Sequence, residues 1–400
     1  MSSSDLDSTM SVVITSAART AIGSFGRSLR DVPPTELGAI AGRAAIERAD
    51  LDPAEVDQVV FGNVIHTSPE DHYLARVVGI NAGVPKGSPA LTINRLCGSG
   101  LQAIITAAQM IDAGDAEVAL AGGAESMSRG AYWMESARWG ARMGEASLVD
   151  SVVGALTDPF EKIHMGVTAE NLAKSHRISR EAQDEFALES HRRAIAAIET
   201  GRFEQEIAPV EVITRKGTVH FTVDEHARSD VSLEGLARLR PAFEKNGTVT
   251  AGNASGVNDA AAAVVVMSAE RAEQLGATVR GRIASYAVCG VEPATMGIGP
   301  VPAIRKALKR AGTAIADVDV IELNEAFAAQ SLAVLQDLGL DTKRVNPNGG
   351  AIGLGHPVAA TGAILVTKIL GEMERGNHKL GLVSLCIGGG QGIAMLIERD

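Results

Sequence analysis

Short apolar runs alternate with stretches of helical spacing along most of the chain. Four runs of aliphatic residues near the N-terminus are typical of buried strands: 11–15, 59–61, 90–93 and 118–121. Apolar positions over 36–50, with Thr35 as the expected N-cap, and over 101–113 recur with the period of a helix. Strands that alternate with helices predict βαβ units and a mainly parallel sheet.

The same order returns in the last third of the chain, which indicates a duplication. Helices are expected at 302–310 and 363–375, a strand at 318–323, and a final hairpin from 383–386 and 393–397. DQVVFGN ends at Asn63 and DVDVIELN ends at Asn324, 261 positions later, while the turns that end at Gly100 and Gly362 are 262 positions apart. Two independent offsets that agree predict a duplicated α/β unit with its reactive side chains at matching ends.

The segment from about 126 to 252 interrupts this pattern, and it holds both tryptophans, most of the histidines and many charges. Helices are expected there at 168–174 and 180–200, and a buried strand resumes at 260–267. We therefore expect an N-terminal half over 1–126, an inserted domain over 127–252, a return to the N-terminal half over 253–280 and a C-terminal half over 281–400.

Composition narrows the possible partners. The net charge of −11 argues against nucleic acid, and no run of about 18 apolar residues indicates a membrane span. The polar, acidic start is not typical of a targeting segment, so we expect a cytoplasmic protein. The three cysteines lie far apart without a CxxC pair, and no metal-binding or nucleotide-binding motif is present, so no metal site is expected.

Cys97 lies in Leu-Cys-Gly-Ser-Gly, between a predicted strand and a predicted helix. The exposed N–H groups and the dipole at a helix N-terminus favour the nucleophilic thiolate. His356, in Gly-His-Pro at the matching turn of the second unit, is a candidate general base for that thiol. The alternatives are a small buried side chain at a tight turn for Cys97 and a structural turn histidine for His356.

Cys386 precedes three glycines at 388–390, whose N–H groups could stabilise a negative oxygen. A second thiol suits a proton transfer from a carbon acid, and a core cysteine at a strand end is the alternative. Asn324 could orient a water or an acyl oxygen, or could cap the next helix. The small polar stretch 252–259 and the mixed charges before it suit an extended anionic ligand, although a plain loop and a solvated face explain them as well.

Taken together, these segments resemble the thiolases over nearly the whole chain. The shared motifs are NRLCGSG, AGGAESMS, HMGVTAEN, GTVTAGNASGVND, NEAFA, GHPVAATG and CIGGGQG. The resemblance implies an α/β fold of two duplicated βαβαβαββ units in five layers, αβαβα, with an inserted loop domain. Within the family the chain is most similar to short-chain β-ketothiolases, because of FGNVIHTSPEDHYLARV, ARWGARMG and DPFEKIHMGVTAEN.

The resemblance also implies residue roles. Cys97 would carry the acyl group, His356 would activate it, and Cys386 would move the α-proton. Asn324 would hold a water in one oxyanion hole, and the N–H groups of Cys97 and Gly388 would form the other. Contacts to coenzyme A or the acyl group would come from seven residues: His164, Met165, Arg228, Phe243, Ser255, Ala326 and Phe327.

The activity so implied is reversible Claisen condensation of two acetyl-CoA to acetoacetyl-CoA and CoA, with 3-ketovaleryl-CoA as a further substrate. Coenzyme A is then substrate and product, no tightly bound cofactor is needed, and a homotetramer is expected. A 3-ketoacyl-CoA thiolase of longer-chain β-oxidation, a decarboxylating ketoacyl synthase and a non-catalytic acyl-CoA-binding protein remain as alternatives. Ala359 replaces the family's usual glycine, and it would be strained if that position needed a positive φ.

Overall fold

The computed structural model describes residues 12–215 and 217–400. The strand predicted from residue 11 begins at Val12, while residue 11 and the polar N-terminal segment lie outside the described residues. In the N-terminal half the elements are β1 Val12–Thr20, β2 Gly23–Ser24, α1 Pro34–Arg48, β3 Gln58–Gly62, α2 Leu74–Asn81, β4 Ala90–Ile93, α3 Ser99–Asp112, β5 Val118–Ser126, β11 Asn258–Ser268 and α8 Ala269–Leu275. The C-terminal half contains β12 Gly281–Gly290, α9 Pro300–Ala311, β13 Val320–Leu323, α10 Ala328–Leu338, α11 Ala351–Leu354, α12 Thr361–Gly376, β14 Leu380–Ile387 and β15 Gln391–Glu398.

The two halves repeat each other in strand order as well as in sequence. The sheet runs β13-β14-β15-β12-β1-β11-β5-β3-β4, so β12, β15, β14 and β13 mirror β1, β11, β5 and β3, while β4 at the edge has no counterpart in this order. The first residue of α12 follows that of α3 by 262 positions, and the first residue of β14 follows that of β5 by the same number. The short β1–β12 pairing at Val13 and Ile14 joins the two half-sheets. The predicted duplication is therefore confirmed.

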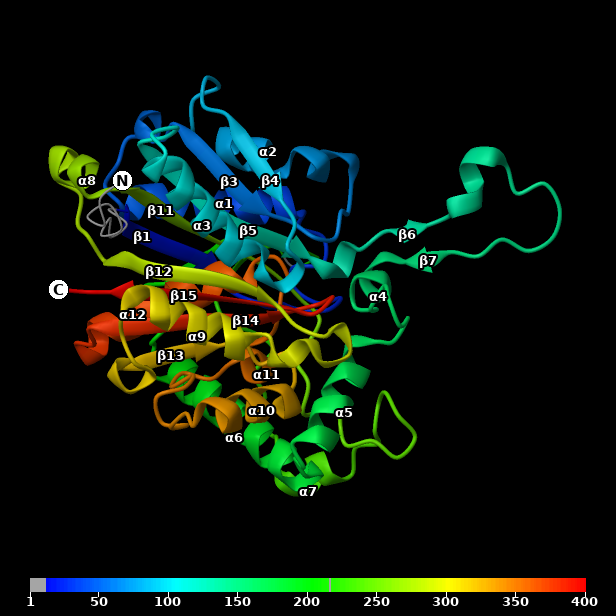
Figure 1. Ribbon diagram of the computed structural model, residues 1–400. Helices are drawn as coiled ribbons and strands as arrows, with labels where there is room; N and C mark the ends of the chain where they lie inside the picture. The colour runs from blue at the N-terminus through cyan, green and yellow to red at the C-terminus, as the bar shows by residue number, and fades with distance from the viewer. Residues whose placement is uncertain (1–11, 216) are drawn as a thin grey trace, which may run out of the picture.

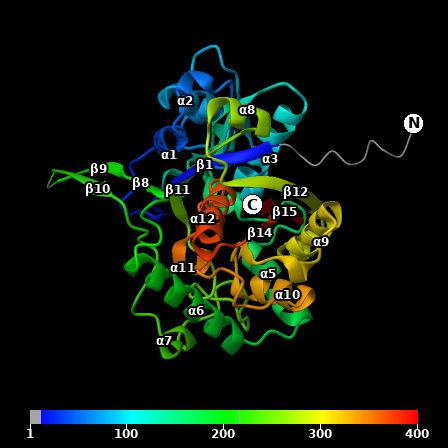
Figure 2. The ribbon, with the colours of Figure 1, turned by 90° about the vertical axis from the view of Figure 1, so that its left-hand side faces the viewer.

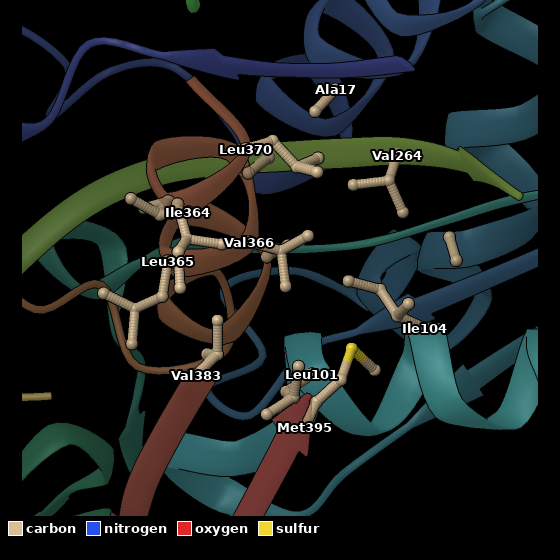
Figure 3. Packing of buried hydrophobic residues seen from close by; sticks show 14 of the residues in the cluster. Ala17, Leu101, Ile104, Val264, Ile364, Leu365, Val366, Leu370, Val383 and Met395 are labelled. Atoms are coloured by element: carbon tan, nitrogen blue, oxygen red, sulfur yellow. The ribbon is translucent and has the colours of Figure 1, made fainter. Parts of the chain in front are cut away.

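Three apolar clusters define the layers. Aliphatic side chains of α3 and α12, among them Leu101, Ile104, Ile364 and Val366, form the central cluster between the half-sheets (Figure 3). A second cluster lies under α1 and α2 on the outer face of the N-terminal half, and a third lies under α9 and α10 on the other outer face. Helices and half-sheets thus alternate in five layers, as predicted.

Two predictions are wrong. The sheet is not mainly parallel, because five of the eight pairings along its path are antiparallel and three are parallel. Thr35 does not cap α1, because the helix begins at Pro34 and its N-cap residue is the extended Pro33. Proline suits the first helical position, since its missing N–H would have no partner there.

The segment between β5 and β11 lies outside the repeated units. It contains β6 Tyr132–Trp133, β7 Val149–Asp150, α4 Ser151–Ala155, α5 Met165–Ser175, α6 Arg180–Glu199, β8 Ile207–Ala208, β9 Val210–Thr214, β10 Gly217–Phe221 and α7 Leu233–Ala237. The arm that begins with β6 and returns through β7 extends far from the body (Figure 1), and the β9–β10 hairpin projects in another direction (Figure 2). Among the described helices, none has the length and apolar character needed to cross a bilayer.

Candidate active site

Cys97 lies in a short turn between β4 and α3, where the sequence predicts it. The turn is closed by Ser99, whose Oγ accepts the N–H of Arg95 at 2.8 Å and donates to the carbonyl of Leu96 at 2.7 Å. Leu96 has a φ of 46°, an uncommon conformation that turns the chain sharply just before the cysteine. Cys97 remains partly exposed in an otherwise buried surrounding.

The ionisation of Cys97 differs from the sequence-based expectation. Burial raises the pKa of its thiol to about 11, and the charge of Glu125 adds to the increase. The N–H groups of Gly388 and of Cys97 itself oppose the shift because they would stabilise the anion. The expected thiolate is therefore wrong for the resting site, where the sulfur is a neutral thiol that needs a base when substrate arrives.

His356 is oriented by hydrogen bonds that select one tautomer. Its Nδ1 lies 2.7 Å from Oγ1 of Thr361, and that hydroxyl donates its own hydrogen to the carbonyl of Pro357 at 2.8 Å. The hydroxyl must then accept from Nδ1–H, so Nε2 carries the lone pair. Burial lowers the pKa of His356 to about 4, which keeps the imidazole neutral at physiological pH. A neutral ring with a free Nε2 is the form that a general base requires.

The backbone of the His356 turn is held on both sides. The His356 N–H donates to Oδ1 of Asn258 at 2.9 Å, and Gly355 before it has a φ of 109°, which a residue with a side chain rarely adopts. Ala359 does not have a positive φ. The strain considered for this alanine is therefore absent, and its buried N–H donates to the carboxylate of Glu125 at 3.0 Å.

Asn324 lies beside His356 and does not cap a helix. Its Nδ2 is 3.4 Å from Nε2 of His356, while α10 begins only at Ala328, after Phe327 as its N-cap residue. The Oδ1 of Asn324 is buried and has no hydrogen-bond partner among the described residues. A buried acceptor of this kind is satisfied by a water or by a ligand group. The helix-cap alternative is therefore wrong, and the amide is free to orient such a group.

Cys386 is the penultimate residue of β14 and is completely buried. Burial raises the pKa of its thiol well above the ordinary range, and the charge of Cys97 raises it further, so the two sulfurs are close enough to influence each other. The glycines that follow allow a tight turn, since Gly389 and Gly390 have φ values of 78° and 82°. This turn places the Gly388 N–H beside the sulfur of Cys97.

An apolar cluster surrounds Cys386 and contains four of the predicted substrate-contacting residues. Its members from that prediction are Met165, Phe243, Ala326 and Phe327. The ring of Phe243 stacks on His164 at a centroid distance of 4.7 Å and meets Phe327 edge to face at 6.1 Å. His164 also caps α5, because its Nδ1 accepts the N–H of Gly166 at 3.1 Å.

A cavity of about 700 Å³ lies next to this cluster and is lined by His164, Arg228 and Ala254, among others. Arg228 is exposed and makes no recorded ion pair with another described residue. Ser255 is not among the lining residues, but it follows Ala254 directly, and its N–H donates to the carbonyl of Ala326 at 3.0 Å. Six of the seven predicted contact residues thus line the cavity or belong to the cluster around Cys386, and Ser255 is hydrogen-bonded to a member of that cluster.

Sequence reasoning gave no role to Glu125, Thr361 or Asn258, although the structure places all three against the catalytic turns. The position of Thr361 was detectable, because it follows Ser99 by 262 positions and the repeat assigns it the same place in its turn. Glu125 and Asn258 belong to AGGAES and GNASGVND, yet their partners lie far away in sequence. In the described part of the chain, no group of three or more His, Cys, Asp or Glu side chains is placed to hold a metal ion.

Comparison with known proteins gives a consistent result across sequence and structure. The profile for the thiolase N-terminal domain matches residues 12–270, and that for the thiolase C-terminal domain matches residues 277–399. The chain is 59% identical to beta-ketothiolase BktB of Cupriavidus necator over 98% of this chain and 100% of that protein. It is 54% identical to an acetyl-CoA acetyltransferase of Pseudomonas aeruginosa over 97% of this chain and 99% of the relative.

Among solved structures, human mitochondrial 3-ketoacyl-CoA thiolase superposes with a TM-score of 0.96 at 47% identity, covering 97% of this chain and 99% of that one. The same human protein in complex with CoA superposes with a TM-score of 0.94 at 47% identity, over 97% and 98% of the two chains.

Proposed function

Because the chain belongs to the thiolase family, we propose that it is an acyltransferase that joins two acetyl-CoA molecules to acetoacetyl-CoA and CoA, and that cleaves acetoacetyl-CoA in the reverse direction. The observation that carries this proposal is the packing of the turn that holds the neutral His356 imidazole against the first turn of α3, which follows the partly exposed Cys97; the thiol of Cys97 also lies beside the Gly388 N–H and interacts with the buried Cys386. Two thiols serve a reaction that needs both an acyl carrier and a base for a weak carbon acid.

In the first half-reaction, Nε2 of His356 takes the proton of Cys97 as the sulfur attacks the thioester carbonyl. The N–H groups of Cys97 and Gly388, which already point at the sulfur, lie where the oxygen becomes negative. The bond between the acetyl carbon and the CoA sulfur then breaks, and CoA leaves with the proton that His356 received. Cys97 is left as an acetyl thioester.

In the second half-reaction, the proton of the neutral Cys386 thiol moves to Nε2 of His356, and the resulting thiolate removes a proton from the methyl group of a second acetyl-CoA. A strongly raised pKa makes the Cys386 thiolate a strong base, which suits so weak an acid. The enolate oxygen accepts hydrogen bonds from Nε2–H of His356 and from a water on Asn324, and the carbanion attacks the acetyl group on Cys97. When the carbon–sulfur bond breaks, the Cys97 sulfur recovers the proton from Nε2 of His356, so that both cysteines and His356 end as they began.

The substrate would enter along the 700 Å³ cavity. We propose that Arg228 holds a phosphate of CoA, since its exposed guanidinium suits an anionic group. Ser255 and His164 would contact the arm that carries the thioester. Met165, Phe243, Ala326 and Phe327 would enclose the acyl group, and the bulk of the two phenylalanine rings, which meet edge to face, favours short chains over long ones. Coenzyme A is then substrate and product, and no tightly bound cofactor is proposed.

The inserted segment 127–252 is proposed as a separate functional domain that supplies α5, the Arg228 loop and the projecting arm. The arm, which extends away from the body (Figure 1), carries exposed large apolar side chains, with Trp133 at 52%, Trp139 at 81% and Met143 at 98% of their surface. Exposed apolar surface of this extent is typical of protein–protein contacts, which supports a homotetramer. The mechanism needs two reduced thiols, which supports a cytoplasmic location.

The experiment that tests the function is a thiolysis assay with acetoacetyl-CoA, 3-ketovaleryl-CoA and a 3-ketoacyl-CoA of at least ten carbons. We expect CoA-dependent cleavage of the two short substrates and little cleavage of the long one. Preference for the long substrate would instead support a thiolase of longer-chain β-oxidation. Binding of acyl-CoA without any cleavage would support the non-catalytic alternative.

A further inference from the structure

Glu125 is a fully buried carboxylate at the end of β5 that the proposed mechanism does not use. One of its oxygens faces the N-terminal half. Oε1 accepts the N–H of Ile65 at 3.0 Å and the side-chain Nδ2 of Asn63 at 3.1 Å. Both donors belong to the segment that follows β3, so this oxygen is held by the half of the molecule that also carries Cys97.

The other oxygen faces the C-terminal half. Oε2 accepts the N–H of Ala359 at 3.0 Å, in the turn that begins at His356. The same turn is closed by the N–H groups of Ala360 and Thr361, which both donate to the carbonyl of Pro357 at 3.0 Å. Because Thr361 orients the His356 ring, a displacement of Ala359 would be passed to the imidazole through two residues of a rigid turn.

At the contact between the two halves, backbone packs so closely on backbone that an added side chain would not fit. A side chain on Gly123, two residues before Glu125, would overlap the carbonyl oxygen of Ala359, and one on Gly100 would also press against that oxygen. The backbone of β5 and the first turn of α3 therefore pack directly on the His356 turn. The carboxylate of Glu125 hydrogen-bonds to both sides of this contact.

The charge of Glu125 also acts on the nucleophile. Burial raises the pKa of Glu125 to about 8, the N–H groups of Ile65, Ala359 and Val64 oppose this shift, and the charge of Asp71 adds to it. In turn, the charge of Glu125 raises the pKa of Cys97. The ionisable groups that couple to Glu125 in these shifts, Asp71 and Cys97, are both acidic.

We propose that Glu125 is a positioning residue, whose carboxylate ties the His356 turn to the half of the molecule that carries Cys97. The inference rests on the proposed function, because it assigns Glu125 to the acyl-transfer step. It gives a role to an acid that is fully buried beside a nucleophile, because a carboxylate offers two acceptor oxygens to donors that approach from opposite sides.

Glu125→Gln is the substitution that isolates this role. Glutamine has nearly the same shape, but it replaces one acceptor oxygen by an NH₂ group, which would face either Ala359 or the Asn63 and Ile65 donors. At a pH above about 8, where Glu125 is mainly ionised, we expect kcat for thiolysis of acetoacetyl-CoA to fall about 10- to 100-fold, because small displacements of a catalytic base are costly. We expect KM for CoA to stay within about twofold, since the proposed CoA contacts lie on other segments.

A second readout concerns charge and does not depend on turnover. The rate of Cys97 alkylation by iodoacetamide, followed by mass spectrometry of its peptide, should rise at lower pH in Glu125→Gln than in the wild type. Removal of the neighbouring negative charge stabilises the thiolate, so the profile shifts to lower pH. Loss of packing alone would not produce this shift. Glu206→Gln is the matched control, because Glu206 is also a buried carboxylate but hydrogen-bonds to Arg19, outside the site.

Wild-type kinetics and an unshifted alkylation profile in a folded Glu125→Gln protein would overturn the proposal, as would equal effects in Glu206→Gln. If Glu125→Gln does not fold, Glu125→Asp replaces it, a variant that keeps the charge but shortens the side chain. A lowered kcat with an unshifted alkylation profile would then support the positioning role of Glu125. An unchanged kcat would contradict it. Absence of thiolysis in the wild type would contradict the proposed function, while the alkylation profile would still test the coupling of Glu125 to Cys97.

Discussion

The Cys97 turn and the His356 turn occupy equivalent places in the two halves of the molecule, yet they hold reactive atoms in different ways. Ser99 and Thr361 are counterparts at the start of α3 and α12, and each donates its hydroxyl hydrogen to a carbonyl of its own turn. In the first turn the hydroxyl oxygen accepts a backbone N–H, whereas in the second it accepts the imidazole Nδ1–H.

This difference shows what the duplication supplies and what it does not. The repeated unit supplies two tight turns that face each other at the ends of the half-sheets. Single residues then give the two turns different roles. The residue 262 positions after Cys97 is Ala359, which carries no reactive group. One half has become the carrier of the acyl group, and the other has become the holder of the base.

The largest effect should follow from Cys97→Ser, which removes the proposed acyl carrier but keeps the turn. A serine hydroxyl is a far weaker nucleophile than a thiol, so kcat/KM for thiolysis of acetoacetyl-CoA should fall on the order of 10³-fold or more. The thermal midpoint should change little. If kcat/KM of the Cys97→Ser variant stayed within tenfold of the wild type, Cys97 would not be the nucleophile.

Cys386→Ser should have the next largest effect, and it should separate the two half-reactions. Loss of the proposed base for the α-proton should lower the condensation rate roughly 10²- to 10⁴-fold. Transfer of an acetyl group from acetyl-CoA to Cys97 should persist, since that step uses His356. Stopped-flow measurement of CoA release gives the acylation rate, and equal losses in acylation and condensation would contradict the division of labour.

The pair Thr361→Val and Ser99→Ala tests the comparison of the two turns directly. Thr361→Val leaves the His356 Nδ1–H without its acceptor, so kcat should fall about 10- to 100-fold, as for other residues that orient catalytic histidines. Ser99→Ala should mainly lower the free energy of unfolding by about 1 kcal/mol through lost backbone contacts. Steady-state kinetics and urea unfolding of both variants test this prediction. Equal losses of kcat in the two variants would show that the two hydroxyl groups do not differ in role.

The pH dependence of stability should also distinguish the second turn. The folded pKa of His356 is about 4 and lies below the ordinary unfolded value of about 6.5, so the unfolded chain binds the proton first as pH falls. Between pH 6.5 and pH 5 this residue should remove about 2 kcal/mol from the free energy of unfolding. Urea unfolding of the wild type and His356→Asn should show a steeper acid loss in the wild type. Parallel curves would contradict a neutral buried imidazole.

The smallest effect is expected from Ala359→Gly, which restores the residue usual in the family at the counterpart of Cys97. Since Ala359 is buried and does not have a positive φ, glycine relieves no strain and only gains freedom in the unfolded chain. The free energy of unfolding should fall by about 0.5–1 kcal/mol while kcat stays unchanged. A stabilised Ala359→Gly protein would show that the alanine is strained after all.

The sequence predicts the repeat and the candidate reactive residues because both can be recognised from short stretches of neighbouring residues. Alternation of apolar runs predicted the half-sheets, and matching offsets predicted that the Cys97 and His356 turns face each other. The ionisation of Cys97 was not predictable, because its raised pKa comes from burial by segments distant in sequence. For the same reason Glu125 could not be found: its partners Ile65 and Ala359 lie on opposite halves of the fold.

The central claim is that one cysteine carries the acyl group while the other moves a proton. The most direct test is to mix the wild type with acetyl-CoA, quench within milliseconds and locate the acetyl group on the cysteine peptides by mass spectrometry. The account predicts an acetyl group on Cys97 and none on Cys386, with formation slowed in His356→Asn. Acetylation of Cys386, or rapid turnover without any acetyl-cysteine, would contradict it.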